Sequence, residues 1–377
     1  MRVALVGPVH PWRGGIAQYL GLLGESLMPR AEVRGVTFTR QYPGFLFPGE
    51  RQHDPAAEPP RFPVEACLDS IGPWSWRATA RRLEAFAPGI VILKWWLPFF
   101  GPAFASAVGP LRGRGTRVML VCDNLIPHER RPFDMAFTRW MLRNSDGYLV
   151  MSESVERDLD RLKRGAPRRR VLHPLYAQFD RGRYTRESAR ARLGLDGEVA
   201  VFFGYVRRYK GLDTLLEAYA GIDGAELWIV GNPRMDVEPL RSAAARARGP
   251  VRFLTRFIED AEIPSILRRA DVLVLPYRDA EQSGVLYTGL AFGKPMVLSE
   301  VGGFGEVAAH SAARLVPPDD PPALAAALEH LVGDEAERGA LAAAAAAAAA
   351  GPYSWDSAAE KTLALYGELL ERREEAR

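Results

Sequence analysis

The sequence has few cysteines and little excess charge. Its two cysteines, Cys67 and Cys122, are far apart in a chain of 377 residues. This number and spacing exclude a disulfide framework and a zinc site built from paired cysteines. Its 49 basic and 46 acidic residues leave a net charge of +3, so the overall charge gives no reason to expect a nucleic-acid partner. We expect a reduced protein located in the cytoplasm.

Long uninterrupted apolar segments are also missing. The chain starts MRVALVGPVH, in which the apolar run is too short for a signal peptide. Only residues 89–110 approach the length of a membrane span, and they contain Lys94, Pro98 and Pro102, which a spanning helix tolerates poorly. We therefore expect no transmembrane segment.

What the sequence does contain is a repeated alternation of strand and helix patterns. Short β-branched or aromatic runs, such as Arg2–Gly7 and Val199–Phe203, are followed by apolar residues at helical spacing. Two successive alternations predict an α/β fold with two Rossmann-like domains that face each other across a cleft. The chain length also favours two domains. We place them at residues 1–180 and 181–354, followed by a C-terminal helix at 355–377.

The segment Val199–Tyr219 contains the clearest candidate for a ligand site. A strand pattern opens it and a helix pattern closes it, and Arg207, Arg208 and Lys210 lie between them. Cations at the carboxyl end of a strand, beside a helix amino terminus, form a site for an anion. Phosphate is the obvious candidate, because guanidinium and ammonium groups bind it through charge-assisted hydrogen bonds. The alternative is a basic loop that is simply solvated.

A second candidate lies near the start of the chain. The strand pattern Arg2–Gly7 is followed by a turn that contains Gly14 and Gly15, and then by a helix pattern. Glycines at this place let a ligand approach the backbone and the helix amino terminus, although a plain tight turn would have the same sequence. The turn lacks a complete GxGxxG motif, so we do not predict a dinucleotide site.

Polar and aromatic residues follow two other predicted strands of the first half. Asp123, His128 and Glu129 come after the strand pattern Arg117–Cys122, at the edge where doubly wound sheets bind ligands. They are candidates for acceptor positioning or proton transfer. Residues 94–100, KWWLPFF, form an aromatic cluster. We expect most of these rings to pack in the core, and the alternatives are a wall for an acceptor or a patch on a bilayer surface.

Two charged segments have simpler interpretations. Asp158-Leu159-Asp160 resembles a metal-binding DxD motif, but it lies inside a charged helix pattern rather than at a strand end. We therefore expect ordinary helix ion pairs there and no metal site. Residues 161–170, RLKRGAPRRR, are strongly basic, and they are either solvated or attracted to an anionic membrane surface.

Four segments of the sequence carry a family resemblance. They are HPWRGGIAQYL near the start, FFGYVRRYKGLDTLLEAY, ADVLVLPYRDAEQSGVLYTGLAFGKPMVLSEVGGFGE, and YSWDSAAEKTLALYGELL near the end. With these segments the chain resembles the retaining glycosyltransferases of the GT-B fold, specifically the large GT4-like group of nucleotide-sugar-dependent enzymes. The resemblance extends over nearly the whole chain, and it implies that the last helix crosses back to brace the amino-terminal domain.

The resemblance also implies donor-binding residues. In that group a pair of cations grips the donor diphosphate, and a glycine loop faces the same phosphates. Backbone amides at a helix start also meet the diphosphate, and the residues after another strand cradle the base. Arg207 and Lys210 match the pair of cations, and Gly14 and Gly15 match the glycine loop. Gly284, Val285 and Leu286 match the helix start, and Arg256, Phe257 and Ile258 match the residues that cradle the base.

The sequence departs from the family pattern in two places. The family's usual pair of glutamates would fall near Ala280 and Thr288. Glu281 lies one residue away and is the candidate substitute for the first glutamate, whereas Thr288 offers only a hydroxyl to the ribose. A Gln-Ser-Gly sequence follows Glu281, as in one branch of the family. Many relatives also have a histidine where this chain has Asp123, which leaves His128 as the nearby imidazole.

The implied activity is the transfer of a sugar, with retention of configuration, from a nucleotide-diphosphate sugar to a saccharide or lipid-linked acceptor. No metal or other cofactor is implied, because cations and helix amides stabilise the departing diphosphate.

The missing glutamate pair leaves two alternatives, a non-catalytic nucleotide-sugar-binding subunit and a GT-B-fold nucleotide-sugar epimerase. A nicotinamide-dependent dehydrogenase is less well supported, because the glycine fingerprint is absent. Peripheral contact with the inner face of the membrane would suit a lipid-linked acceptor.

Overall fold

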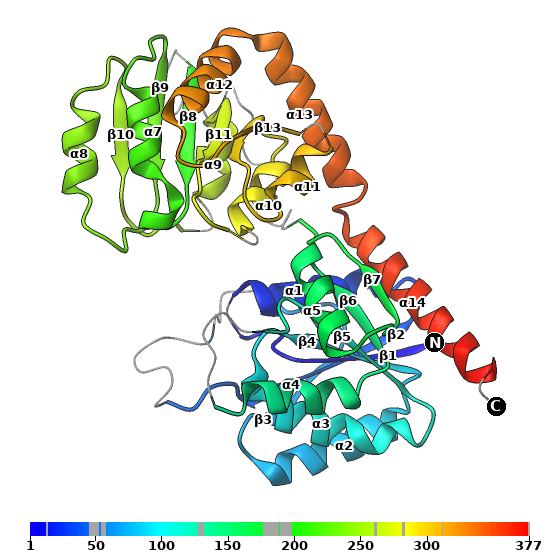
Figure 1. Ribbon diagram of the computed structural model, residues 1–377. Coiled ribbons are helices and arrows are strands. Elements are labelled where there is room, and N and C mark those ends of the chain that lie inside the picture. Colours follow the sequence, from blue (N-terminus) through cyan, green and yellow to red (C-terminus); the bar gives the residue numbers. More distant parts are fainter. Residues whose placement is uncertain are drawn as a thin grey trace. The chain divides into compact units, whose positions relative to one another are not determined.

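A computed structural model describes residues 1–12, 14–44, 53, 58–126, 132–175, 188, 198–259, 262–280, 283–310 and 312–375. The chain forms two compact units (Figure 1). Unit 1 consists of Met1–Leu172 together with Trp355–Arg377, and unit 2 consists of His173–Ser354. The boundary that we predict at residue 180 falls outside the described residues.

Unit 1 contains a seven-stranded sheet in which every pair of neighbours is parallel. The order is β3-β2-β1-β4-β5-β6-β7, so the order reverses between β1 and β4, the kind of point at which doubly wound folds bind ligands. The central strands are almost entirely apolar because both faces of the sheet are covered. The strands are β1 Arg2–Val6, β2 Glu32–Arg40, β3 Val64–Asp69, β4 Ile90–Trp95, β5 Arg117–Cys122, β6 Gly147–Val150 and β7 Arg168–Arg170.

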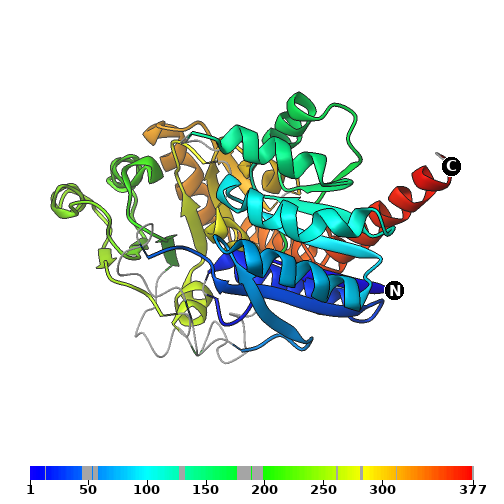
Figure 2. The same cartoon turned by 90° about the horizontal axis from the view of Figure 1, so that it is seen from below.

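Helices cover both faces of this sheet. One hydrophobic core contains side chains of α1 and α14, and the other contains side chains of α2, α3, α4 and α5. Although α14 is last in the chain, it lies with the elements of unit 1 in both views (Figures 1 and 2). There Trp355 packs edge-on against the Tyr19 ring. The helices are α1 Gly15–Leu27, α2 Pro73–Phe86, the 3-10 helix η1 Pro98–Phe100, α3 Gly101–Arg112, α4 Asp134–Arg143, α5 Glu153–Leu162 and α14 Trp355–Glu375.

Unit 2 repeats this architecture with six parallel strands in the order β10-β9-β8-β11-β12-β13. Here the order reverses between β8 and β11. The strands are β8 Glu198–Phe203, β9 Ala225–Val230, β10 Val251–Leu254, β11 Val272–Leu275, β12 Met296–Ser299 and β13 Ala313–Val316. The helices are η3 Arg208–Lys210 (a 3-10 helix), α7 Leu212–Tyr219, α8 Glu238–Ala244, α9 Ile263–Arg269, α10 Gly284–Ala291, α11 Phe304–Ala308, α12 Pro321–Gly333 and α13 Glu335–Ala350.

The two sheets confirm the predicted fold class, an α/β protein with two Rossmann-like domains. Asp158 and Asp160 lie inside α5, as we predict. The alanine-rich tract forms α13, which ends before Gly351. The sequence patterns do not predict β3, β7 or β13. All three strands lie at an edge of their sheet, where more side chains face solvent, so they lack the apolar pattern of a buried strand.

The basic segment 161–170 is largely paired rather than free. Its last three residues form β7, and each guanidinium of that strand lies within ion-pair distance of at least one carboxylate. The pairs are Arg168 with Glu156 and Asp160, Arg169 with Glu368, and Arg170 with Glu153. These pairs leave less positive charge for an anionic membrane than the sequence suggests.

The aromatic cluster at residues 94–100 belongs mainly to the core of unit 1, as we predict. Trp95 and Phe100 are buried, and Trp96 and Phe99 are partly buried against the same core. Across the parts of the chain that the structure describes, no helix combines the length and the apolar composition that a membrane crossing requires.

Candidate functional site

The strongest candidate site lies in the loop between β8 and α7. The chain turns at Gly204, with φ +122°, and at Gly211, with φ +64°. A Cβ atom on Gly211 would overlap the carbonyl oxygen of Pro276, so only glycine fits where this loop crosses the loop after β11. Between the two glycines, Arg207 precedes the turn η3 and Lys210 ends it.

Lys210 is a buried cation that has no carboxylate partner among the described residues. Only 6% of it is exposed, and its ammonium lies 4.7 Å from the centre of the Tyr277 ring and 5.8 Å from that of Phe202. Burial, together with the charge of Arg207, lowers the pKa of Lys210 to about 8. A bound anion would offset both effects, so this position favours a negatively charged ligand.

Two arginines extend the positive charge at this edge of the sheet. The guanidinium of Arg207 lies 5.9 Å from the Tyr205 ring, and that of Arg234, from the loop after β9, lies 5.2 Å from the same ring. Both arginines are exposed, and neither pairs with a carboxylate in the described part of the chain. The amide of Arg234 donates to the Val206 carbonyl, which joins the two loops. The sequence does not single out Arg234, because it lies outside the segments that carry the family resemblance.

Arg278 fixes the loop that carries these cations. Its amide donates to the Tyr209 carbonyl at 2.7 Å, and its guanidinium donates to the Arg208 carbonyl at 3.0 Å. The same guanidinium binds Asp213 at 2.9 Å and Asp319 at 2.5 Å. These bonds connect the loop after β11 with η3 and with the start of α7. The sequence does not reveal this role, because every one of these partners is at least 41 residues away.

The start of α10 provides backbone donors beside the same loop. Ser283 occupies the N-cap position, but its side chain makes no capping hydrogen bond, so the first amides of the helix have no side-chain acceptor there. Gly284 is exposed and Val285 is half-buried. A Cβ atom on Gly204 would lie 2.9 Å from the Lys210 ammonium and 3.1 Å from a Val285 methyl. The fold therefore brings Lys210 and the start of α10 together at Gly204.

Leu286 and Thr288, which we predict at the donor, are buried in unit 2. The Thr288 hydroxyl donates to the Gly284 carbonyl at 2.8 Å, within the same helix. This bond uses the hydroxyl proton, so a contact between Thr288 and a ribose would have to use the oxygen lone pairs. Leu286 would contribute its backbone amide, because its side chain is fully buried.

The segment after β10, predicted to cradle the base, has one exposed ring. Phe257 is 42% exposed, and Ile258 is buried. Arg256 makes two hydrogen bonds to Glu262, at 2.6 and 2.8 Å, and these bonds lower the pKa of Glu262 to about 2. An exposed ring beside a strand end suits stacking on a nucleotide base, and this role stays a prediction.

The candidate residues of unit 1 lie in the loops after β1 and β5. Gly14 has φ +106° and open space around the position of a Cβ atom, and Gly15 begins α1 without a side-chain cap. Asp123 accepts a hydrogen bond at 2.5 Å from Lys94, of which only 1% is exposed and whose ammonium lies 3.6 Å from the centre of the Tyr19 ring. Asp123 is therefore the counter-ion of a buried lysine, and its role in acceptor positioning or proton transfer stays a prediction.

Two other predicted catalytic residues, His128 and Glu281, lie outside the described residues. Within the described residues, the side chains of His330, Asp334 and Glu337 lie close enough together to hold a metal ion. Glu337 already pairs with an arginine and Asp334 caps α13. These carboxylates therefore have structural partners, and they belong to the α12–α13 corner rather than to the loop after β8.

Comparisons with known proteins match both halves of the chain. Residues 197–334 match the family model described as "Glycosyl transferases group 1", and residues 14–175 match "Glycosyl transferase 4-like domain". A D-inositol 3-phosphate glycosyltransferase of Jonesia denitrificans is 31% identical over 198 residues, which are 48% of this chain and 46% of that protein. A phosphatidyl-myo-inositol mannosyltransferase of Mycolicibacterium smegmatis is 34% identical over 178 residues, 45% of each chain. The matched part thus spans just under half the length of these relatives.

Solved structures resemble the whole chain. Sucrose-phosphate synthase from Thermosynechococcus elongatus superposes with a TM-score of 0.71 at 20% identity, covering 99% of this chain and 100% of that one. Anabaena Alr3699/HepE in complex with UDP superposes with a TM-score of 0.73 at 16% identity, covering 98% and 100%. At these identities the likeness concerns the fold.

The role of Arg278 leads to a test with a simple anion. We expect Arg278→Met to weaken binding of inorganic pyrophosphate by about tenfold, because the loop that carries Arg207 and Lys210 loses its anchor. Isothermal titration calorimetry measures the affinity, and circular dichroism checks the fold. Arg314→Met is the matched control, since it removes another exposed ion pair of unit 2 away from this loop. Unchanged affinity in Arg278→Met, or an equal loss in the control, would contradict the anchoring role.

Proposed function

Because the chain belongs to the GT4-type glycosyltransferases with the GT-B fold, we propose that it transfers a sugar from a nucleotide-diphosphate sugar to an acceptor hydroxyl. The observation that supports this most directly is the buried Lys210, which has no carboxylate partner in the described part of the chain and lies beside Arg207 and the uncapped start of α10. Two cations and a row of amides match the charge and the several acceptor oxygens of a diphosphate.

The proposed chemistry concerns the departing nucleoside diphosphate. As the bond to the sugar breaks, negative charge grows on the phosphate oxygens. Lys210 and Arg207 supply positive charge, and the amides of Gly284 and Val285 supply hydrogen bonds that are already oriented by α10. Such groups perform the charge stabilisation that a divalent ion gives in other enzymes, so we propose that transfer is independent of metal. Retention of configuration is proposed from the family resemblance.

The acceptor is proposed to be an inositol, a saccharide or a glycolipid. The names of the two relatives above refer to inositol 3-phosphate and to phosphatidyl-myo-inositol, and both are acceptors with ring hydroxyls. In unit 1 the open turn at Gly14 follows β1, Lys94 lies near the end of β4, and Asp123 directly follows β5. We propose that the turn at Gly14 and the Asp123 carboxylate position the acceptor, because buried Lys94 holds this carboxylate in place and a carboxylate accepts a hydrogen bond from a hydroxyl.

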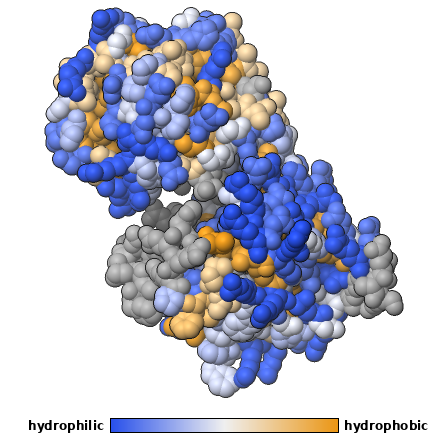
Figure 3. Space-filling model, viewed as in Figure 1, coloured by the Kyte–Doolittle hydropathy of each residue, from blue (hydrophilic) through white to orange (hydrophobic). Residues whose placement is uncertain are grey.

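Membrane contact would bring the enzyme to a lipid-linked acceptor, and helix α4 has the side chains for it. Phe133 and Phe137 stack with ring centres 6.3 Å apart, and Trp140 follows one turn later. Phe133 is 72% exposed and Trp140 is 40% exposed, and Arg139 and Arg143 are also exposed. Hydrophobic and strongly hydrophilic residues lie side by side on this face of unit 1 (Figure 3). Exposed rings with flanking cations suit an anionic bilayer surface.

Substitution of the two cations tests the proposed function. We expect Arg207→Ala and Lys210→Ala each to lower kcat/KM by about a hundredfold, because each removes one group that stabilises the departing diphosphate. The assay measures release of UDP or GDP from a panel of nucleotide sugars, with inositol phosphate or glycolipid acceptors, in the presence of EDTA. Arg208→Ala is the matched control, because its exposed side chain belongs to the same turn.

The same assay distinguishes the alternatives. Near-normal turnover in both variants would remove these cations from the mechanism, and activity of the unsubstituted chain that appears only when EDTA is left out would refute independence of metal. Nucleotide-sugar binding without transfer or hydrolysis would favour a non-catalytic subunit. Interconversion of free nucleotide sugars would instead favour an epimerase. Nuclear magnetic resonance of the product gives the anomeric configuration.

The lowered pKa of Lys210 predicts a pH dependence. Lys210 is charged below its pKa of about 8 and neutral above it, so affinity for UDP or GDP should fall as the pH rises. We expect roughly a tenfold loss between about pH 7 and about pH 9.5, because one charge-assisted hydrogen bond disappears. Titration calorimetry across this range measures it. In Lys210→Arg the charge persists, so the curve should flatten, and an unchanged slope would assign the effect to another group.

The α4 surface predicts binding to anionic vesicles. We expect Phe133→Ser with Trp140→Ser to lower binding to phosphatidylglycerol vesicles about tenfold, because the double variant removes apolar area that would enter the interface. Co-sedimentation measures the bound fraction. Phe257→Ser, which removes an exposed ring of unit 2, is the control. Equal binding by the double variant and the control would exclude α4 as the contact.

A further inference from the structure

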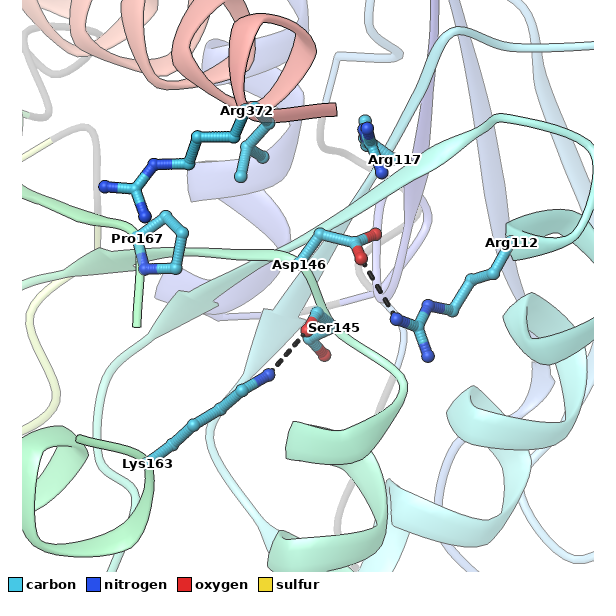
Figure 4. A pocket seen from close by; sticks show the side chains of 8 residues that line it. Arg112, Arg117, Ser145, Asp146, Lys163, Pro167 and Arg372 are labelled. Atoms are coloured by element: carbon cyan, nitrogen blue, oxygen red, sulfur yellow. Dashed lines mark hydrogen bonds and ion pairs between the residues drawn. The ribbon is translucent and has the colours of Figure 1, made fainter. Parts of the chain in front are cut away.

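A pocket in unit 1 collects basic side chains from elements that are far apart in the sequence. It has a volume of about 360 Å³ and lies where strands β5, β6 and β7 begin, at the opposite edge of the sheet from Asp123. Arg112 ends α3, Arg117 begins β5, Lys163 follows α5, and Arg372 lies in the last turns of α14. Figure 4 shows Arg112, Arg117 and Lys163 on different sides of Asp146, and Arg372 farther out with its guanidinium beside Pro167.

The one carboxylate that lines this pocket is already occupied. Asp146 accepts a hydrogen bond from the Val118 amide at 2.8 Å and one from Arg112 at 3.1 Å. Lys163 donates instead to three neutral oxygens, the carbonyls of Leu142 and Ser145 and the Tyr148 hydroxyl, at 2.8 to 2.9 Å. The lining therefore keeps a large excess of positive charge.

Two of the arginines have no counter-ion in the described part of the chain. Arg372 is exposed and pairs with no carboxylate there. Arg117 likewise pairs with none, and its buried Nε has no hydrogen-bond partner. In β7, by contrast, Arg168 and Arg169 pair with carboxylates. Burial lowers the pKa of Lys163, the charge of Asp146 partly offsets this, and the charge of Arg112 lowers the pKa further.

We propose that this pocket binds the phosphate group of a phosphate ester, with Arg117 and Arg372 as the direct ligands. The guanidinium fork matches the geometry of phosphate oxygens, while Arg112 and Lys163 contribute positive charge. The volume exceeds that of one phosphate ion, so there is room for part of the esterified group. The site is separate from the loop after β8, which belongs to unit 2, and it does not depend on the proposed sugar transfer.

Binding at this pocket would also fasten α14 to the rest of unit 1. Arg372 belongs to α14, whereas Arg117 belongs to the sheet, so a phosphate held by both connects the two elements directly. The last turns of α14 should then exchange their amide hydrogens more slowly, because opening of the helix end would require release of the ligand.

The test titrates inorganic phosphate into the full chain carrying Lys210→Ala, which removes a main cation of the loop after β8 as a competing site. Calorimetry gives the affinity, and hydrogen exchange shows where protection occurs. We expect Arg372→Gln and Arg117→Gln to weaken phosphate binding about tenfold each, and protection to map to α14 and to the start of β5. Arg164→Gln is the matched control, an exposed cation that does not line the pocket.

Vesicles distinguish the source of the phosphate group. If free phosphate binds with this dependence on Arg372, a soluble phosphate ester is supported. If only phosphatidylinositol phosphate vesicles bind, and Arg372→Gln releases the chain from them, a lipid headgroup is supported. Absence of both kinds of binding would overturn the proposal, as would an equal loss in Arg164→Gln or protection confined to unit 2.

Discussion

In both sheets all neighbouring strands pair in parallel, and this constraint places the cations around Lys210 in unit 2 and the arginine pocket in unit 1. Neighbouring strands run the same way, so their carboxyl ends meet at one edge of each sheet and their amino ends at the other. In unit 2 the carboxyl edge gathers the loops after β8, β9 and β11, and with them Lys210, Arg234 and Arg278. In unit 1 the same rule separates Asp123 from the arginine pocket, which collects its residues at the other edge.

Lys210 differs from the other buried cations of the structure. Lys94 is paired with Asp123, and Arg269, which is fully buried, pairs with Asp271 at 3.2 Å. Pairing of this kind is the usual way in which a folded protein tolerates a buried charge. Within the described residues Lys210 has no such partner, so its position is better explained by a ligand than by stability.

The sequence predicts those parts of the molecule that depend on neighbours in the chain. Arg207 and Lys210 stand between a strand pattern and a helix pattern, and the structure places both in that loop. Contacts between distant residues were not predictable: Arg278 anchors that loop through residues at least 41 positions away, and Lys94 lies 29 positions from Asp123. Edge strands such as β7 were also missed, because backbone pairing holds them rather than an apolar pattern.

Helix α14 makes unit 1 discontinuous, and this has a consequence for synthesis of the chain. The core between α1 and the sheet includes Ala358, Ala359, Leu365 and Leu369 of α14, which leave the ribosome only after all of unit 2. Until then, the apolar surface around Tyr19 stays uncovered. Unit 2 is one continuous stretch and can finish folding first, so the half of the protein that is translated earliest completes its folding last.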